Sequence, residues 1–134
     1  MFTDLETAIR DLLAGTIPAI PVLGTWDRVD MTADGAKRIA MQVEYQGFDA
    51  LQNKPGAVTL GPRFAVHVVV DAGAALVTER AAAEAGMQTT IERLLAWPPP
   101  LEVEIQSSPL IQLDGRELRM SVFFTLAPVV VTAN

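Results

Sequence analysis

Apolar and polar residues alternate along a central stretch of the chain, from Arg63 to Asp71. Its large apolar residues stand two positions apart, and they are Phe64, Val66, Val68 and Val70. Side chains two positions apart lie on the same side of a β-strand, so this stretch predicts a strand with one wholly apolar face. Val69 falls on the opposite side of that strand, where we expect it to be exposed.

Two other stretches follow the period of an α-helix. The first runs from Thr3 to Ala14 and opens on a capping box, in which Thr3 and Glu6 satisfy amides of the first turn. Gly15 ends this helix. The second runs from Thr78 to Ala96 and is stopped by the prolines that follow it. Its predicted inner stripe consists of Ala83, Met87, Thr90, Ile91, Leu94 and Leu95.

Three further segments alternate as strands do. They cover residues 38–45, Leu101 to Gln106, and a hairpin over 110–126 whose turn is Asp114-Gly115. Phe123 lies on the outward side of that hairpin. Residues 17–26 contain two prolines and predict an edge strand or an irregular lead-in. The apolar tail at 129–134 needs a covering element if it is not to aggregate.

These one-sided strands need a second layer, and the two amphipathic helices supply it. The sequence therefore predicts an α+β two-layer sandwich, with one mainly antiparallel sheet of four to five strands and two helices packed on one face. No repeat, low-complexity tract or linker interrupts residues 1–134, so we expect a single domain.

The segment from Gly47 to Pro62 joins two neighbouring strands and predicts a long loop. Such loops are uncommon inside compact domains and are usually functional or mobile. We interpret it as a hairpin arm that stands off the sheet and binds a partner. Its apolar tips are Phe48, Leu51, Val58 and Leu60. The alternative is a loop that folds back over the edge of its own domain.

Composition narrows the class of partner. The formal net charge is −6, with only ten Lys and Arg, and no basic run offers the cation cluster that nucleic-acid binding requires. There is no cysteine. We expect no membrane span, because no segment approaches the ~20 apolar residues that a bilayer requires, and no signal peptide, because the N-terminus is acidic.

The residues that carry chemistry are few. His67 is the only histidine, and its place in mid-strand favours a half-buried or interface role over that of a general base. Ser107, Ser108 and Ser121 lack a nucleophile-elbow motif. Glu102 and Glu104 share a strand face, which is more typical of a solvated surface than of an acid–base pair. We therefore predict no enzymatic activity and no catalytic, cofactor-binding or metal-binding residues.

The predicted surface is unusually apolar for a monomer. The outward residues Val69 and Phe123, the four arm tips and the tail would all be covered in an oligomer. The alternative is that the core is thicker than this pattern suggests.

Five segments together resemble the tail terminator (tail-completion) proteins of long-tailed bacteriophages and their relatives at the head–tail neck. They are "FTDLETAIRDLLA", "KRIAMQVEYQGF" with the loop after it, "RFAVHVVVDAG", "TERAAAEAGMQTTIERLLAWPPP" and "ELRMSVFFTLAP". The resemblance lies in their order, length and pattern, and it covers most of the chain.

The resemblance implies a structural virion protein that forms a ring, usually a homo-hexamer. The ring caps the tail tube protein and docks the head–tail connector, after assembly in the host cytoplasm. DNA passes through the lumen without specific binding, and the acidic residues Glu44, Glu102 and Glu104 could face that lumen. By position, residues 47–62 correspond to the family's loop that reaches a neighbouring ring or subunit.

Two other functions stay open at this point. One is a small-molecule-binding or enzymatic α+β domain with a site near His67, Tyr45 and Trp97. The other is an assembly adaptor with no phage link.

Overall fold

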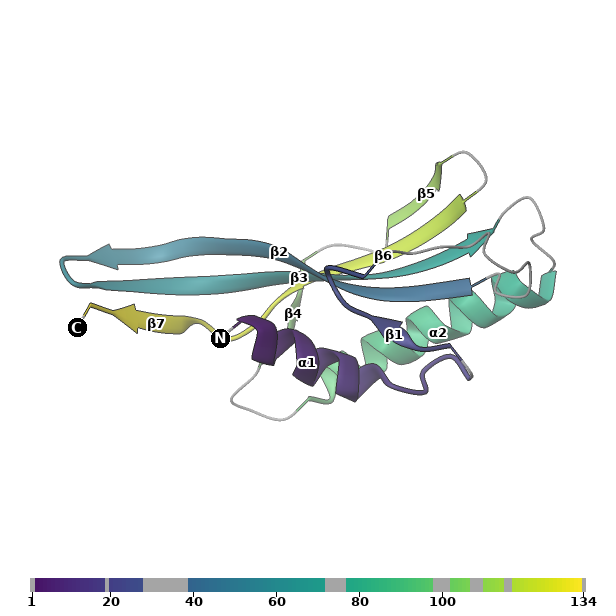
Figure 1. The fold of residues 1–134 in the computed structure, drawn as a ribbon, viewed down its shortest axis with the longest axis horizontal. Coiled ribbons are helices and arrows are strands. Elements are labelled where there is room, and N and C mark those ends of the chain that lie inside the picture. Colours follow the sequence, from purple (N-terminus) through teal and green to yellow (C-terminus); the bar gives the residue numbers. More distant parts are fainter. Residues whose placement is uncertain are drawn as a thin grey trace.

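A computed structural model describes residues 2–18, 20–27, 39–71, 77–97, 102–106, 110–114 and 117–133 of the chain, in two layers (Figure 1). One layer holds the helices α1 (Phe2–Leu13) and α2 (Val77–Leu95). The other is a sheet whose strands, within the described ranges, are β1 (Val22–Leu23), β2 (Ile39–Lys54), β3 (Ala57–Asp71), β4 (Glu104–Ile105), β5 (Leu110–Asp114), β6 (Glu117–Thr125) and β7 (Val129–Thr132).

The sheet is built around β3, the strand that the alternation at 63–71 predicts. Its strand order is β1-β2-β3-β6-β4, while β5 also pairs with β6 and β7 also pairs with β3. Every pair is antiparallel except β1 with β2. The α+β sandwich and its mainly antiparallel sheet are thus confirmed. The described sheet has seven strands rather than four to five, because the short strands β1 and β7 add to its margins.

The helices cover the predicted apolar face of the sheet. Phe64, Val66, Val68 and Val70 are all fully buried there. Phe64 lies 6.1 Å from Phe124 and 5.3 Å from Tyr45, measured between ring centroids. The helices contribute Ile9, Leu13, Ala83, Met87 and Leu94 to the same cluster. Since burying one such side chain stabilises a fold by roughly 1.5–3 kcal/mol, this layer carries most of the stability.

Two contacts join α2 to the segment around the end of α1. Gly86 leaves room for Ile17, because a Cβ at position 86 would lie 2.5 Å from that side chain. Arg93 donates to the carbonyl oxygens of Leu12 at 3.2 Å and Ala14 at 2.9 Å, so it caps the end of α1. The absence of a side chain at Gly86 therefore permits the close approach of Ile17 to α2.

One residue of the expected helix stripe is misplaced. Leu95 is 62% exposed, whereas its neighbour Leu94 is fully buried. Successive helical residues are about 100° apart around the axis, so the last turn can bury only one of the two. The rest of the expected stripe is confirmed: Ala83, Met87, Thr90 and Leu94 are buried, and Ile91 packs against the core.

Candidate assembly surface

The segment expected to be a loop is a pair of long strands. The ladder between β2 and β3 continues from Phe48 opposite Pro62 to Lys54 opposite Ala57, and the turn is only Pro55-Gly56. Gly56 has a φ of 79°, which glycine adopts at little cost. The expectation of a loop was wrong, and so was the alternative that it folds back. The hairpin projects well beyond both helices (Figure 1).

The C-terminal tail forms the third strand of this projection. β7 pairs with β3 from Val129 opposite Leu60 to Thr132 opposite Ala57. The Ala133 amide also donates to the Gly56 carbonyl at 2.7 Å. We call residues 46–62 together with 129–133 the arm. β3 is therefore the element that pairs with the apolar tail.

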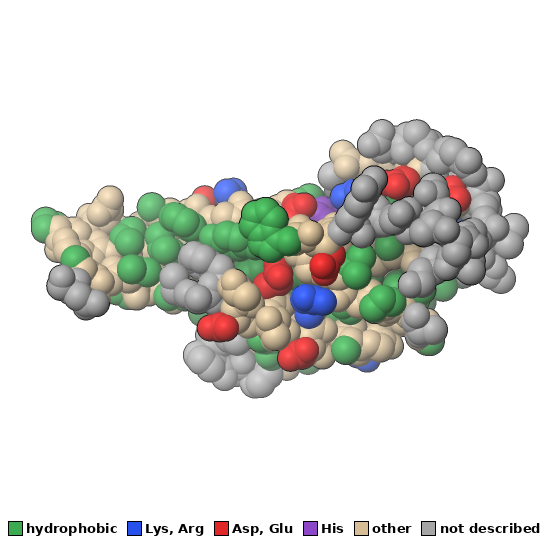
Figure 2. All heavy atoms as spheres, in the orientation of Figure 1, with side chains coloured by type: hydrophobic (Ala, Val, Ile, Leu, Met, Phe, Trp, Pro, Cys, Tyr) green, Lys and Arg blue, Asp and Glu red, His purple; other side chains and the backbone are tan. Residues whose placement is uncertain are grey.

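The four predicted arm tips differ in exposure. Phe48 and Leu51 are 46% and 57% exposed, Val58 is half-buried, and Leu60 is buried at 6%. Leu60 is therefore not an exposed tip, because β7 and β2 flank it in the three-stranded arm. Val130 and Val131 add 62% and 38% exposed side chains from β7. Hydrophobic side chains are visible along the arm on the face that Figure 2 shows.

The outer edge of β2 is irregular within the arm. Its register with β3 shifts between Tyr45 and Phe48 and again between Ala50 and Gln52. Bulges of this kind bend an edge strand and discourage the addition of another strand. We therefore expect the arm to make contacts through its exposed side chains rather than by extending the sheet.

Val69 does not form an exposed patch with Phe123. Val69 is fully buried, so the prediction that it is exposed was wrong. It lies in the central strand, with Ala40 and Arg119 opposite it on either side. Phe123 is half-buried and meets His67 edge-on, at 6.3 Å between ring centroids. The thicker core that we held as an alternative is correct at Val69.

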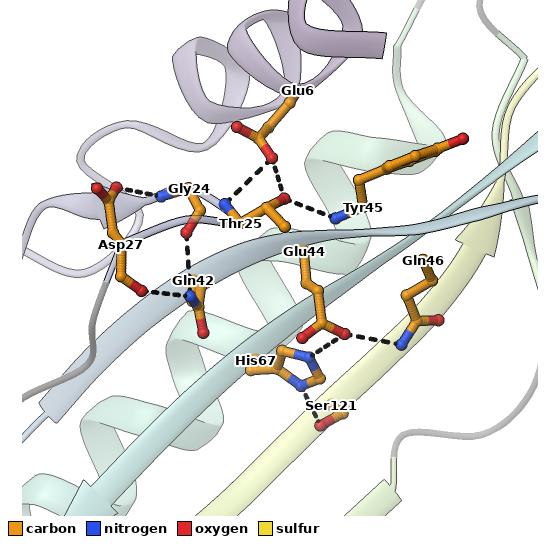
Figure 3. A network of polar contacts seen from close by, with 10 residues as sticks. All are labelled: Glu6, Gly24, Thr25, Asp27, Gln42, Glu44, Tyr45, Gln46, His67 and Ser121. Atoms are coloured by element: carbon orange, nitrogen blue, oxygen red, sulfur yellow. Dashed lines mark hydrogen bonds and ion pairs between the residues drawn. The ribbon is translucent and has the colours of Figure 1, made fainter.

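His67 lies in a row of polar side chains across three strands (Figure 3). Its Nδ1 is 2.6 Å from Oγ of Ser121 on β6. Its Nε2 is buried 3.5 Å from Oε1 of Glu44 on β2 and makes no hydrogen bond of good geometry. Gln46 donates to that same carboxylate oxygen at 3.0 Å. Burial lowers the pKa of His67, and Glu44 partly opposes this effect.

This row contains the residue types of a hydrolytic triad, but a substrate could not reach its serine. Ser121 is 2% exposed and His67 is 5% exposed. A nucleophilic serine must reach a substrate carbonyl, and a serine buried in the middle of a sheet does not. The 2.6 Å contact is a hydrogen bond in either tautomer: the Ser121 hydroxyl donates to an unprotonated Nδ1, or a protonated Nδ1 donates to the hydroxyl oxygen. The row therefore serves as a buried polar link between strands.

The residues of the alternative small-molecule site do not converge. Tyr45 and Trp97 pack against the core cluster under the helices. His67 points to the other face of the sheet, toward Ser121 and Phe123. Within the described ranges no three His, Cys, Asp or Glu residues are grouped as a metal site would require. Neither described helix is both long and apolar enough to cross a membrane.

The turn from Gly24 to Asp27 presents a side chain that the sequence patterns did not single out. Trp26 is 95% exposed. The available signal was a large aromatic residue within a short polar turn beside Gly24. An indole left almost wholly in water is uncommon on a monomer and is typical of a residue that anchors an interface.

This turn is held rigidly against the body (Figure 3). Glu6 of α1 accepts hydrogen bonds from the amide and the hydroxyl of Thr25. The Thr25 hydroxyl in turn accepts from the Tyr45 amide at 2.8 Å. On the other side, Gln42 donates to the carbonyls of Gly24 and Asp27, each at 3.0 Å. The turn therefore holds Trp26 outward by contacts that do not involve the indole.

A groove crosses the root of the arm on the face away from the helices. Two adjoining hollows of about 230 and 270 Å³ share Asp49 and Gln106. The larger one is also lined by Leu51, Gly61 and Glu104. Leu51 lies 3.2 Å from the position of a Cβ on Gly61, so this glycine leaves space for the leucine at the floor of the groove.

Comparison with solved structures shows what this fold resembles. A chain from the virion of a native gene transfer agent (GTA) particle aligns with a TM-score of 0.55 and 16% identity, over 92% of this chain and 93% of its own length. A second solved chain aligns with a TM-score of 0.51 and 13% identity, over 93% and 92%. No protein-family model and no curated protein matches the sequence. At these identities the likeness establishes a shared fold.

Proposed function

We propose that the protein is a structural component of the virion of a tailed bacteriophage or phage-like particle. The observation that carries this proposal is the fold shared, over nearly the whole of both chains, with a chain from a gene transfer agent virion. The resemblance of the sequence to tail terminator proteins refines it. We infer a ring of subunits, with six expected from that family, that caps the tail tube and joins it to the head–tail connector.

The geometry supports a subunit that acts by contact. The arm extends away from the two-layer body and carries exposed apolar side chains at Phe48, Leu51 and Val130. Because the body is stabilised by its own core, it can fold without the arm. The arm is then free to contact a neighbouring subunit or ring. The buried Ser121–His67 pair fits a structural role better than a catalytic one.

The charge of the chain suits a channel for DNA. With a net charge of −6, a ring of these subunits repels phosphates rather than holding them. Glu104 is exposed and Glu44 is half-buried, both on the face away from the helices. We propose that this face, rather than the helical layer, lies nearer the lumen.

Assembly on tail tubes tests the proposal. The purified protein is expected to form rings in light scattering over a concentration series, and to bind the ends of purified tail tubes in electron micrographs. Added connector protein should then join the capped ends. A protein that remains monomeric at every concentration and leaves tube ends bare would contradict the proposed function.

A further inference from the structure

We infer that neighbouring copies of this chain join head to tail, with Trp26 of one copy seated in the arm-root groove of the next. We place the indole in the larger of the two hollows of this groove, whose lining includes Asp49, Leu51, Gly61, Glu104, Gln106 and Thr125. This inference rests on the proposed ring and identifies the two surfaces that meet within it.

The first argument is where the two features lie in the sheet. Trp26 lies in the turn after β1, at one end of the strand order, whereas residues of β2, β3, β4 and β6 line the groove. A ring needs a heterologous interface, in which two different surfaces of the subunit meet. The Trp26 turn and the groove are two different surfaces, so one copy can insert its indole into a neighbour while its own groove receives the indole of another copy.

The second argument is size. A cavity of roughly 150 Å³ can hold a benzene ring, so a hollow of about 270 Å³ can admit an indole. Leu51, which is 57% exposed, supplies an apolar floor for it. Burying a tryptophan covers roughly 150–250 Å², about a quarter of the ~800 Å² that each partner contributes to a stable interface. The exposed arm residues Phe48 and Val130 can supply more.

The third argument is polar complementarity. The indole N–H can only donate a hydrogen bond. The groove offers carboxylate acceptors on two of its walls, at Asp49 and Glu104. Hydrogen bonds from Glu6 and Gln42 also fix the backbone of the Trp26 turn before the two surfaces meet. A turn that is already ordered loses little entropy on association.

Two complementary variants test the inference. Trp26→Ala removes the indole and leaves the groove intact. Leu51→Glu replaces the apolar floor of the groove with a carboxylate and leaves the indole intact. Each variant alone should be monomeric, with self-association weakened roughly thirtyfold or more, as for a central tryptophan hot spot. An equal mixture of the two should form dimers and no rings, because only one kind of junction then remains intact.

Controls separate this inference from the proposed function. Leu95→Ala removes another large exposed apolar side chain, 62% exposed on α2, and should leave assembly unchanged. If Trp26→Ala forms rings as the wild type does, or if the mixture stays monomeric, the inferred junction is wrong while the ring itself stands. If the wild type neither assembles nor caps tubes, the proposed function fails and the junction with it.

A second measurement does not depend on loss of assembly. Benzoylphenylalanine placed at position 26 keeps an aromatic group there and crosslinks to what it touches on illumination. With a mixture of isotopically light and heavy chains, the expected product joins position 26 of one copy to the arm-root groove of another. Crosslinks confined to one chain, or directed to the helices, would overturn the inference.

Discussion

The contact between Gly86 and Ile17 allows a prediction whose sign changes with the background. A Cβ at position 86 would lie 2.5 Å from Cγ1 and 2.7 Å from Cδ1 of Ile17. Ile17 is buried at 4%, so its side chain has little room to move away. Gly86→Ala should therefore overpack this contact, although alanine is the better helix former.

The two effects can be weighed. Replacing glycine by alanine inside a helix stabilises it by roughly 1 kcal/mol. Overpacking a well-packed core costs roughly 1–3 kcal/mol, so Gly86→Ala alone should lose about 1 kcal/mol. In an Ile17→Ala background both clashing atoms are absent, and Cβ of residue 17 is 4.0 Å away. There Gly86→Ala should gain the full helix term of roughly 1 kcal/mol.

Chemical denaturation of the four proteins in this cycle measures both values. Ile17→Ala itself should cost roughly 2–5 kcal/mol, which a domain of this size should tolerate. The coupling between the two sites is then expected at about 2 kcal/mol. If Gly86→Ala has the same effect in both backgrounds, position 86 does not require glycine for packing, and the close approach of Ile17 to α2 is wrong.

Three further predictions follow from the same structure. Replacing residues 50–60 by a short turn and removing 129–134 should lower the melting temperature only slightly, because the core cluster contains none of these residues. The same change should abolish assembly. A loss of cooperative unfolding would contradict this prediction. Both Val68→Asp and Val69→Asp should prevent folding, as judged by circular dichroism, because both side chains are fully buried and a carboxylate there is unpaired. Because burial lowers the pKa of His67 in the folded state, the unfolded chain takes up a proton on this residue at a higher pH than the folded chain does. The stability of the wild type should therefore fall as the pH drops below the ordinary value of 6.5, and that of His67→Asn should fall less. Melting temperatures that decrease equally with pH in the two proteins would refute this.

The layers of the fold could be predicted because each element depends on a local period. The alternation at Phe64, Val66 and Val68 predicts which face of β3 is buried. The helical stripe at Ala83 and Met87 predicts which face of α2 packs on it. These patterns fix register, since a slip by one residue would expose the whole apolar face. They do not show how much of the second face is covered, which is why Val69 was misjudged.

The interpretation of residues 47–62 as a projecting hairpin agrees with the structure, but the expectation of a loop in place of paired strands was wrong for a related reason. Residues 47–62 contain the pairs Pro55-Gly56 and Gly61-Pro62, and such pairs are typical of turns and loops. Only Pro55-Gly56 forms the turn, whereas Gly61 and Pro62 lie within β3. A Cβ at Gly61 would lie 3.2 Å from Leu51 on the neighbouring strand, and single-sequence periodicity does not reveal such a contact between strands.

Trp26 shows why the assembly surface was harder to find than the core. Its position depends on Glu6, Thr25 and Gln42, which come from three separate elements and meet only in the folded chain. The sequence pattern assigns Glu6 to a capping box at the start of α1, and it does not indicate that its carboxylate accepts from Thr25 instead. The indole is 95% exposed, while the hydrogen bonds that hold the turn come from its backbone and from Thr25. The free energy of burying that indole is therefore still available for binding a neighbour, which is what a subunit that folds before it assembles requires.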